Sequence, residues 1–180
     1  MIKILFILLF CISCDNDDIK TYRAVKAPVS AKNIQLPTVT DNNLKWDLPK
    51  TWSVSSGSSM RLASYNIPHS NGIGDLSVMI LAGDGGGVEA NMNRWRGQIN
   101  LNSQTLSEIN NQSEDRKNSL ANYQIFTVIN NDNFEKAFIC AIIPLENRTI
   151  FVKLNISAKG IIEIKDDFIY FCDSFRLNDA

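Results

Sequence analysis

The sequence predicts an α+β fold in which an antiparallel sheet of about six strands is covered by helices. One observation is a set of short segments, rich in β-branched and aromatic residues, that turn residues separate. The other is a pair of segments in which apolar residues recur three and four positions apart, as on one face of a helix. Their order is β-β-β-α-β-β-β-α. Tight turns favour antiparallel pairing, and each helix has one apolar face to bury against the sheet.

The first half of the folded region is expected to contain three strands. Residues 44–49 (LKWDLP) predict a short strand that ends at a proline, followed by a turn that buries Trp52. Residues 61–67 (RLASYNI) predict the second strand. Residues 69–74 (HSNGIG) are rich in turn formers and predict a loop. Residues 76–82 (LSVMILA) are almost wholly apolar, which is typical of a buried central strand.

Residues 88–100 predict an amphipathic helix, because their apolar positions are spaced four, three and four apart. The side chains on this stripe are Val88, Met92, Trp95 and Ile99. Residues 101–120 are polar, with a short helix expected around 106–110.

The second half is expected to contain strands at residues 123–129, 134–144 and 149–156. A C-terminal helix follows, in which large apolar side chains recur at helical spacing. These side chains are Ile161, Ile164, Phe168, Phe171 and Phe175.

The start of the chain has the layout of an export signal. Lys3 precedes the apolar run ILFILLFCIS, which is far shorter than the ~20 residues of a membrane-spanning helix. This layout predicts a signal peptide over residues 1–13. Ser13-Cys14 resembles the lipobox of bacterial lipoproteins, although Cys11 stands where that family prefers Leu. The resemblance implies that Cys14 carries a lipid, such as palmitate, that anchors the protein to a membrane; a plain signal peptide is the alternative.

Residues 14–43 predict a lipidated N-terminus and a flexible tether, since this polar segment shows no sustained hydrophobic period. Its acidic run, Asp15, Asp17 and Asp18, resembles an inner-membrane retention signal or a surface-export signal of lipoproteins; a solvated spacer is the alternative. We therefore expect the protein in the bacterial cell envelope, at the periplasmic face of either membrane or at the cell surface. Residues 44–180 are expected to form a single domain.

The charge and the cysteines exclude several classes of function. With 18 basic and 19 acidic residues, the net charge of −1 gives no electrostatic case for nucleic acid. Cys140 and Cys172 lie in apolar stretches, so buried thiols are favoured and a disulfide between them is the alternative. There is no metal-ligand spacing such as C-x-x-C, and neither a metal nor a cofactor is expected.

A glycine-rich stretch joins the third expected strand to the first helix. Its residues are Gly83, Asp84, Gly85, Gly86 and Gly87. A P-loop would need a lysine after the last glycine, and a dinucleotide fingerprint would need glycine where Val88 stands. Glu89 would place its carboxylate at the helix N-terminus, where it competes with any anion. A structural strand-to-helix connection is favoured; a small-molecule or anion-binding module is the alternative.

The helix that follows has polar flanks. Asn91, Arg94 and Gln98 fall on one flank, and Arg96 falls on the other. The two arginines therefore cannot easily converge on one ligand. The flank with Asn91, Arg94 and Gln98 is a candidate binding surface for an envelope protein whose identity the sequence does not give.

Catalysis would need His69, the one histidine in the sequence. Asp75 and Asp84 bracket the third strand and are the candidate partners nearest to His69 in the chain. No G-x-S-x-G elbow is present. We favour an exposed loop histidine over a hydrolase that uses His69, and we assign no catalytic residue.

The element order and two weak motifs resemble a known fold family. These motifs are LPKTW, which contains Trp52, and F.DSFR over residues 171–176. Together with the element order they resemble the PsbP-like fold of DcrB-type bacterial envelope lipoproteins, over about residues 44–177. The resemblance implies a small antiparallel sheet covered by helices, in proteins that act mostly as accessory or assembly factors. We therefore expect a membrane-anchored lipoprotein with a non-catalytic accessory or binding domain.

Overall fold

The structure is a computed structural model that describes residues 43–178. These residues belong to one compact unit of the chain, Val39–Ala180. The expected signal peptide (1–13) and the lipidated Cys14 lie outside the described residues, and so does the expected tether apart from its last residue, Asn43. Among the described residues, no helix is both long and apolar enough to cross a membrane.

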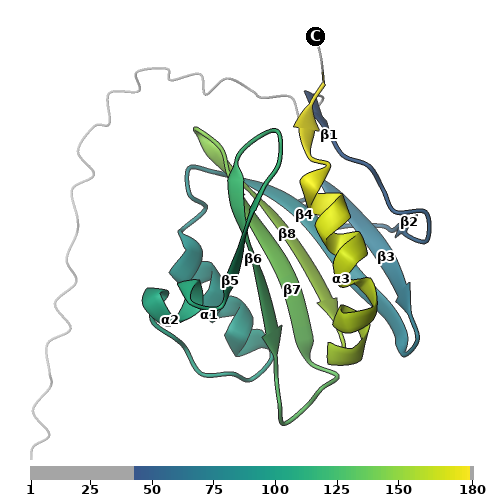
Figure 1. The fold of residues 1–180 in the computed structure, drawn as a ribbon, viewed down its shortest axis with the longest axis vertical. Helices are drawn as coiled ribbons and strands as arrows, with labels where there is room; N and C mark the ends of the chain where they lie inside the picture. Colours follow the sequence, from purple (N-terminus) through teal and green to yellow (C-terminus); the bar gives the residue numbers. More distant parts are fainter. Residues whose placement is uncertain (1–42, 179–180) are drawn as a thin grey trace, which may run out of the picture. The chain divides into compact units, whose positions relative to one another are not determined.

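A seven-stranded sheet forms the centre of the unit, with the strand order β2-β3-β4-β8-β7-β6-β5 (Figure 1). Every neighbouring pair in it is antiparallel. Its strands are β2 (Ser53–Val54), β3 (Ala63–His69), β4 (Gly72–Ala82), β5 (Ser113–Lys117), β6 (Asn122–Ile129), β7 (Ala137–Pro144) and β8 (Arg148–Ile156). A separate two-stranded sheet pairs β1 (Leu44–Lys45) with β9 (Arg176–Leu177).

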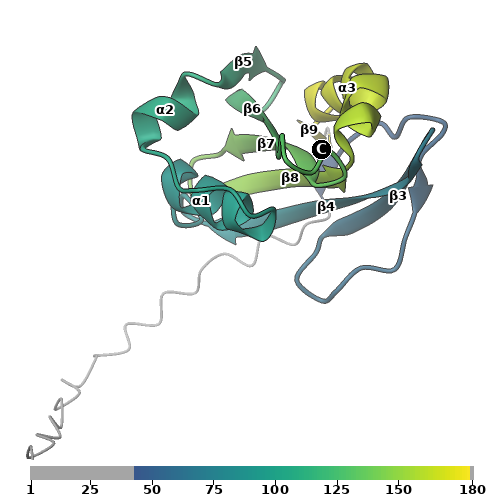
Figure 2. The same ribbon diagram turned by 90° about the horizontal axis from the view of Figure 1, so that it is seen from below.

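Helices cover both faces of the large sheet. Helix α3 (Ala158–Asp173) packs on one face, and α1 (Val88–Gln98) with α2 (Leu106–Asn110) lies on the other (Figure 2). The predicted α+β class, an antiparallel sheet covered by helices, is confirmed. The sheet has seven strands where the sequence predicted about six.

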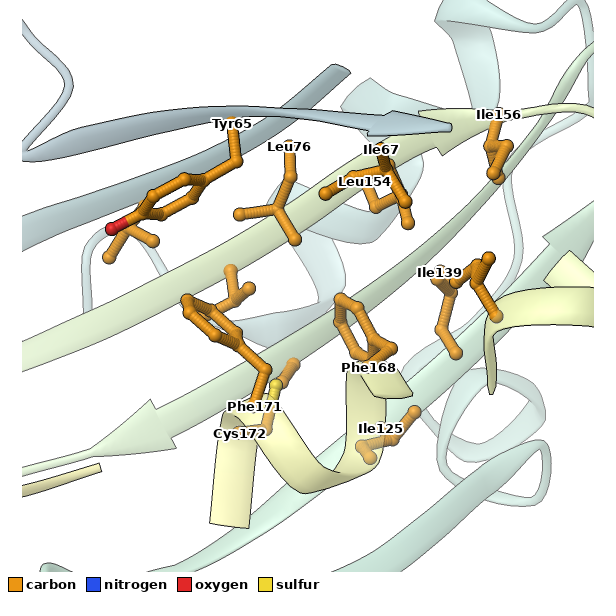
Figure 3. Close-up of a cluster of buried hydrophobic side chains, with 14 of the residues drawn as sticks. Tyr65, Ile67, Leu76, Ile125, Ile139, Leu154, Ile156, Phe168, Phe171 and Cys172 are labelled. Carbon is orange, nitrogen blue, oxygen red and sulfur yellow. The ribbon is translucent and has the colours of Figure 1, made fainter. Parts of the chain in front are cut away.

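The larger core lies between α3 and the sheet. Phe168 and Phe171 point from α3 toward apolar side chains of β3, β4 and β8, and both are fully buried (Figure 3). Each buried aromatic ring of this size contributes roughly 1.5–3 kcal/mol of transfer free energy. Ser157 caps the helix, since its Oγ accepts a hydrogen bond from the amide of Gly160 at 3.1 Å. The helical spacing read from the sequence therefore corresponds to this buried face.

The smaller core lies between α1 and the sheet. Trp95 meets Phe138 and Phe151 edge to face, with ring centroids 6.1 and 6.0 Å apart. Met92 and Ile99 are buried beside it, so three of the four predicted stripe positions are core residues. The fourth stripe residue, Val88, is partly buried at the start of the helix.

The two cysteines lie on opposite sides of the large sheet. Cys140 belongs to the core under α1, whereas Cys172 belongs to the core under α3. Both are free thiols with no exposed surface, and burial raises the pKa of each thiol above its ordinary value. The disulfide alternative is therefore wrong, because the sheet itself separates the two sulfur atoms.

Several elements differ from the sequence-based expectation, and among them the two-residue strands β2 and β9 were not predicted. The strand expected at 44–49 is only two residues long, because the ring of Trp46 leaves it to stack on Phe175 at 5.1 Å. The loop expected at 69–74 is a tight hairpin, in which His69 ends β3 and Gly72 begins β4. Strand β5 was not predicted at all, since its sequence SEDRK carries no hydrophobic pattern.

Candidate partner-binding groove

The glycine-rich stretch is a tight turn between β4 and α1. Gly83, Gly85, Gly86 and Gly87 all have positive φ, at 60°, 62°, 94° and 81°. Such angles disfavour any residue with a side chain. A β-carbon on Gly85 would also lie 2.5 Å from the ring of Phe151. The glycines therefore let the chain reverse tightly, so that α1 packs back across β8.

The backbone amides of this turn are already used. Gly86 donates to Oδ1 of Asp84 at 2.9 Å, and Gly87 donates to the Asp84 carbonyl at 3.1 Å. The amides of Gly83 and Gly85 donate to nearby carbonyl oxygens at 2.9 and 3.2 Å. An anion in this turn would have to displace these four hydrogen bonds, which favours the structural interpretation of the glycines.

Asn91 fastens the helix to the turn. Its Nδ2 donates to the carbonyl oxygens of Gly85 and Gly87 at 2.9 and 2.8 Å, and its Oδ1 accepts from Arg94 at 2.8 Å. The residue is 5% exposed. The expectation that Asn91 belongs to an open binding flank is therefore wrong, because the turn needs its amide to satisfy two carbonyl groups. Arg94 and Gln98 are exposed as expected.

Gln98 lies beside a buried lysine that sequence reasoning missed. Nζ of Lys153 donates to Oε1 of Gln98 at 2.6 Å and lies 5.2 and 4.8 Å from the ring centroids of Trp95 and Phe138. Desolvation by burial lowers the pKa of Lys153 from 10.5 to about 8. The signal in the sequence was a single charge inside the apolar strand TIFVKLNI. Lys153 holds the end of α1 on the sheet.

The candidate catalytic residues do not converge. Nδ1 of His69 accepts a hydrogen bond from the amide of Asn71 at 3.2 Å, at the hairpin tip between β3 and β4. Asp75 is held by two hydrogen bonds from Arg61, at 2.7 and 2.8 Å. Asp84 follows the opposite end of β4, roughly 20 Å or more from Asp75 at the usual rise per strand residue. Within residues 43–178, no group of three or more His, Cys, Asp or Glu side chains is placed to hold a metal.

Beside the glycine turn, a groove runs over the end of the sheet that α1 does not cover. It consists of two adjoining hollows of about 640 and 650 Å³, which share Gly87, Val88 and Gln124. We call it the sheet-end groove. Its other lining residues include Asp84, Glu89, Leu106, Asn110, Asp115, Arg116, Lys117, Asn122, Tyr123, Ile142, Pro144 and Thr149.

One wall of the sheet-end groove is fixed by a carboxylate on α3. Asp173 accepts hydrogen bonds from Arg116 at 2.7 Å and from the hydroxyl of Tyr123 at 2.6 Å. Burial, with the hydrogen bond to Asp173, raises the pKa of Tyr123 above its ordinary value, so this hydroxyl stays protonated. With the charge of Arg116 balanced in this way, the carboxylates that line the groove outnumber its cations.

Among the comparisons with known proteins, one solved structure bears on the fold. No protein-family model and no curated protein matches the chain. The solution structure of CyanoP, the cyanobacterial PsbP of Synechocystis sp. PCC 6803, aligns with 77% of this chain and 88% of its own, at a TM-score of 0.50 and 15% identity. A crystal structure from Bacteroides thetaiotaomicron VPI-5482 aligns with 76% of this chain and 45% of its own, at a TM-score of 0.42 and 9% identity. The likeness to CyanoP supports the PsbP-like fold.

Two positions of the glycine turn, Gly83 and Gly85, should respond differently to an added methyl group. In Gly85→Ala, positive φ and the ring of Phe151 both oppose the new β-carbon, so we expect a loss of about 2–4 kcal/mol in unfolding free energy. Gly83→Ala is the matched control, because its φ is also near 60° but nothing lies within 4 Å of a β-carbon there. It should cost about 1 kcal/mol. Urea denaturation measures both, and equal losses would contradict the close approach of Gly85 to Phe151.

Lys153 should make stability depend on pH. Its pKa is lowered on folding, so the unfolded state binds more protons between about pH 8 and pH 10.5, and its contribution to stability rises with pH across that window. Lys153→Met lacks this contribution and keeps the apolar packing. The unfolding free energy of the natural protein minus that of the variant should therefore rise by roughly 2 kcal/mol from pH 7.5 to pH 10. A difference that does not change with pH would show that the ammonium group is well solvated.

Proposed function

We propose that this chain is a membrane-anchored lipoprotein of the cell envelope whose domain is a non-catalytic accessory or binding module. The observation that carries the proposal is the sheet-end groove, an open and largely apolar hollow on the sheet. Val88, Ile142 and Pro144 contribute apolar surface to its lining, and charged residues such as Asp84 and Glu89 line it as well. Protein–protein contacts usually combine apolar and polar surface in this way.

The fold is consistent with a binding role. The sequence resemblance to PsbP-like envelope proteins implies accessory or assembly factors, and the likeness to CyanoP supports the fold part of that expectation. The groove also draws on elements far apart in the chain, from the glycine turn to β8, which the two cores hold in place. A partner would therefore meet a surface that is already organised before binding.

The anchor is part of the same proposal and rests on the sequence of the N-terminus. Ser13-Cys14 supplies the acceptor for a lipid, and the chain from there to Asn43 is long enough to act as a spacer between membrane and domain. The protein then works at a membrane surface of the envelope and engages another envelope protein through the groove.

In-cell photo-crosslinking of the full-length chain tests the proposal. A photoreactive residue at Gln124 or Val88 should capture one specific partner, because both side chains line the groove. The matched control is the same residue at Lys159, which is exposed on α3, outside the groove. Equal capture from Lys159, or no capture from the groove, would contradict a binding role for the groove. In the same cells Cys14→Ser should move the protein from the membrane to the soluble fraction, and unchanged partitioning would refute the lipid anchor.

A further inference from the structure

Strand β5 forms one edge of the large sheet and pairs only with β6. The amide of Asn118 donates to the carbonyl of Ala121 at 3.1 Å, which makes these two the first hydrogen-bonded pair of the β5–β6 hairpin. Bonded and non-bonded pairs alternate along an antiparallel ladder. Opposite Gln124, Asp115 therefore occupies a non-bonded position, as do the residues two places before and after it. Their backbone N–H and C=O groups point outward from the sheet.

The neighbouring ladder gives the same result. The amide of Asn130 donates to the carbonyl of Lys136 at 3.1 Å at the end of the β6–β7 pair. Alternation from there makes Gln124 a bonded partner of β7, which directs its backbone groups away from β5. Among the described residues no other strand pairs with the outer edge of β5. Ser113, Asp115 and Lys117 therefore present unpaired donors and acceptors at the edge.

This edge is continuous with the sheet-end groove. Asp115 lies opposite Gln124, and Gln124 lies opposite Ile142, so the three side chains share the face that α1 covers elsewhere. All three line the groove, together with Lys117. A strand added beside β5 would continue the sheet, and every second side chain of that strand would lie at the groove.

The charged side chains at the edge formed by β5 determine which kind of strand would pair with it. On the α3 face, Arg116 pairs with Asp173 at 2.7 Å and Glu114 pairs with Lys165, so these charges are balanced within the fold. On the groove face, the lining contains the carboxylates of Asp84, Glu89 and Asp115 but only one ammonium group, that of Lys117. Charged edges discourage indiscriminate strand pairing. A strand with basic residues on its groove side would compensate this acidic excess.

We propose that β5 is a strand-addition site for an extended segment of a protein partner. Every second side chain of this segment is apolar or basic and lies at the groove, and the side chains between them point away from it. Main-chain hydrogen bonds to β5 supply affinity, and the groove reads alternate side chains. This inference rests on the proposed function, since it names how the partner occupies the sheet-end groove.

A peptide selection on the full-length Cys14→Ser protein tests the site. The probe is a random library of twelve-residue peptides displayed on phage. Selected peptides should have alternating apolar residues with an excess of Lys and Arg. Asp115→Pro removes an outward N–H and puts a ring in the path of the added strand, while every backbone hydrogen bond to β6 remains. It should weaken the Kd of these peptides by about tenfold or more.

The matched control is Val54→Pro at the opposite edge of the sheet. The amide of Ser55 donates to Ser64, so the backbone groups of Val54 also point outward by the same alternation. This variant should leave the Kd unchanged. If Asp115→Pro fails to fold, the selected peptides provide a second test. Two series of the peptides are N-methylated at every second amide, one at the odd positions and one at the even positions. The series whose methylated amides point toward β5 should lose binding, and the other series should keep it.

Two results would overturn strand addition. One is a selection that yields no binding peptide. The other is that the selected peptides bind Asp115→Pro as tightly as the unchanged protein and that both N-methylated series bind as tightly as the unmodified peptides. If photo-crosslinking from Gln124 still captures a partner in that case, the groove keeps its binding role and only the strand-addition mode fails. If crosslinking from the groove also fails, the proposed function itself is wrong.

Discussion

Strand β7 is apolar on both faces, and the rest of the fold depends on this constraint. Ile139 and Ala141 face α3, whereas Phe138 and Cys140 face α1. Burying only one face would leave the other set of side chains in water, at a cost of about 25 cal/mol per Å² of apolar surface. The chain must therefore place a helix on each side of the sheet. Helix α3 follows β8 directly, but α1 must reach the opposite face straight after β4.

The glycine turn carries the chain from β4 to the opposite face of the sheet and sets where α1 begins on that face. Positive φ at Gly85 and the close approach of Phe151 set the start of α1, and Asn91 then ties the helix to the turn. Because α1 begins here and runs across the sheet toward Lys153, the part of this face beside the turn, over β6 and β7, stays open. The sheet-end groove is thus the part of this face that α1 leaves uncovered.

Where burial follows the local pattern, the sequence was sufficient to predict the fold. The stripe of α1 around Met92 and Trp95 and the aromatic face of α3 could be assigned from spacing, because apolar side chains at those intervals have one shared direction. Strand β5 could not be assigned from the sequence, because its charged side chains pair with Lys165 and Asp173 on a helix more than fifty residues away in the chain. The buried position of Asn91 depends on carbonyl groups that only the folded turn presents.

Only one side of the candidate site could be predicted from the sequence, again because the other side depends on contacts between distant residues. The glycine turn was visible as a motif, whereas the β5–β6 wall opposite it arises from tertiary pairing. The most direct measurement is hydrogen exchange of individual amides in the full-length Cys14→Ser protein, with and without a peptide selected for binding. The account predicts that exchange at Asp115 and Lys117 slows by about tenfold or more, because these amides become donors to an added strand, while Val54 is unchanged. Slowed exchange at Val54, or at the glycine turn without β5, would contradict it.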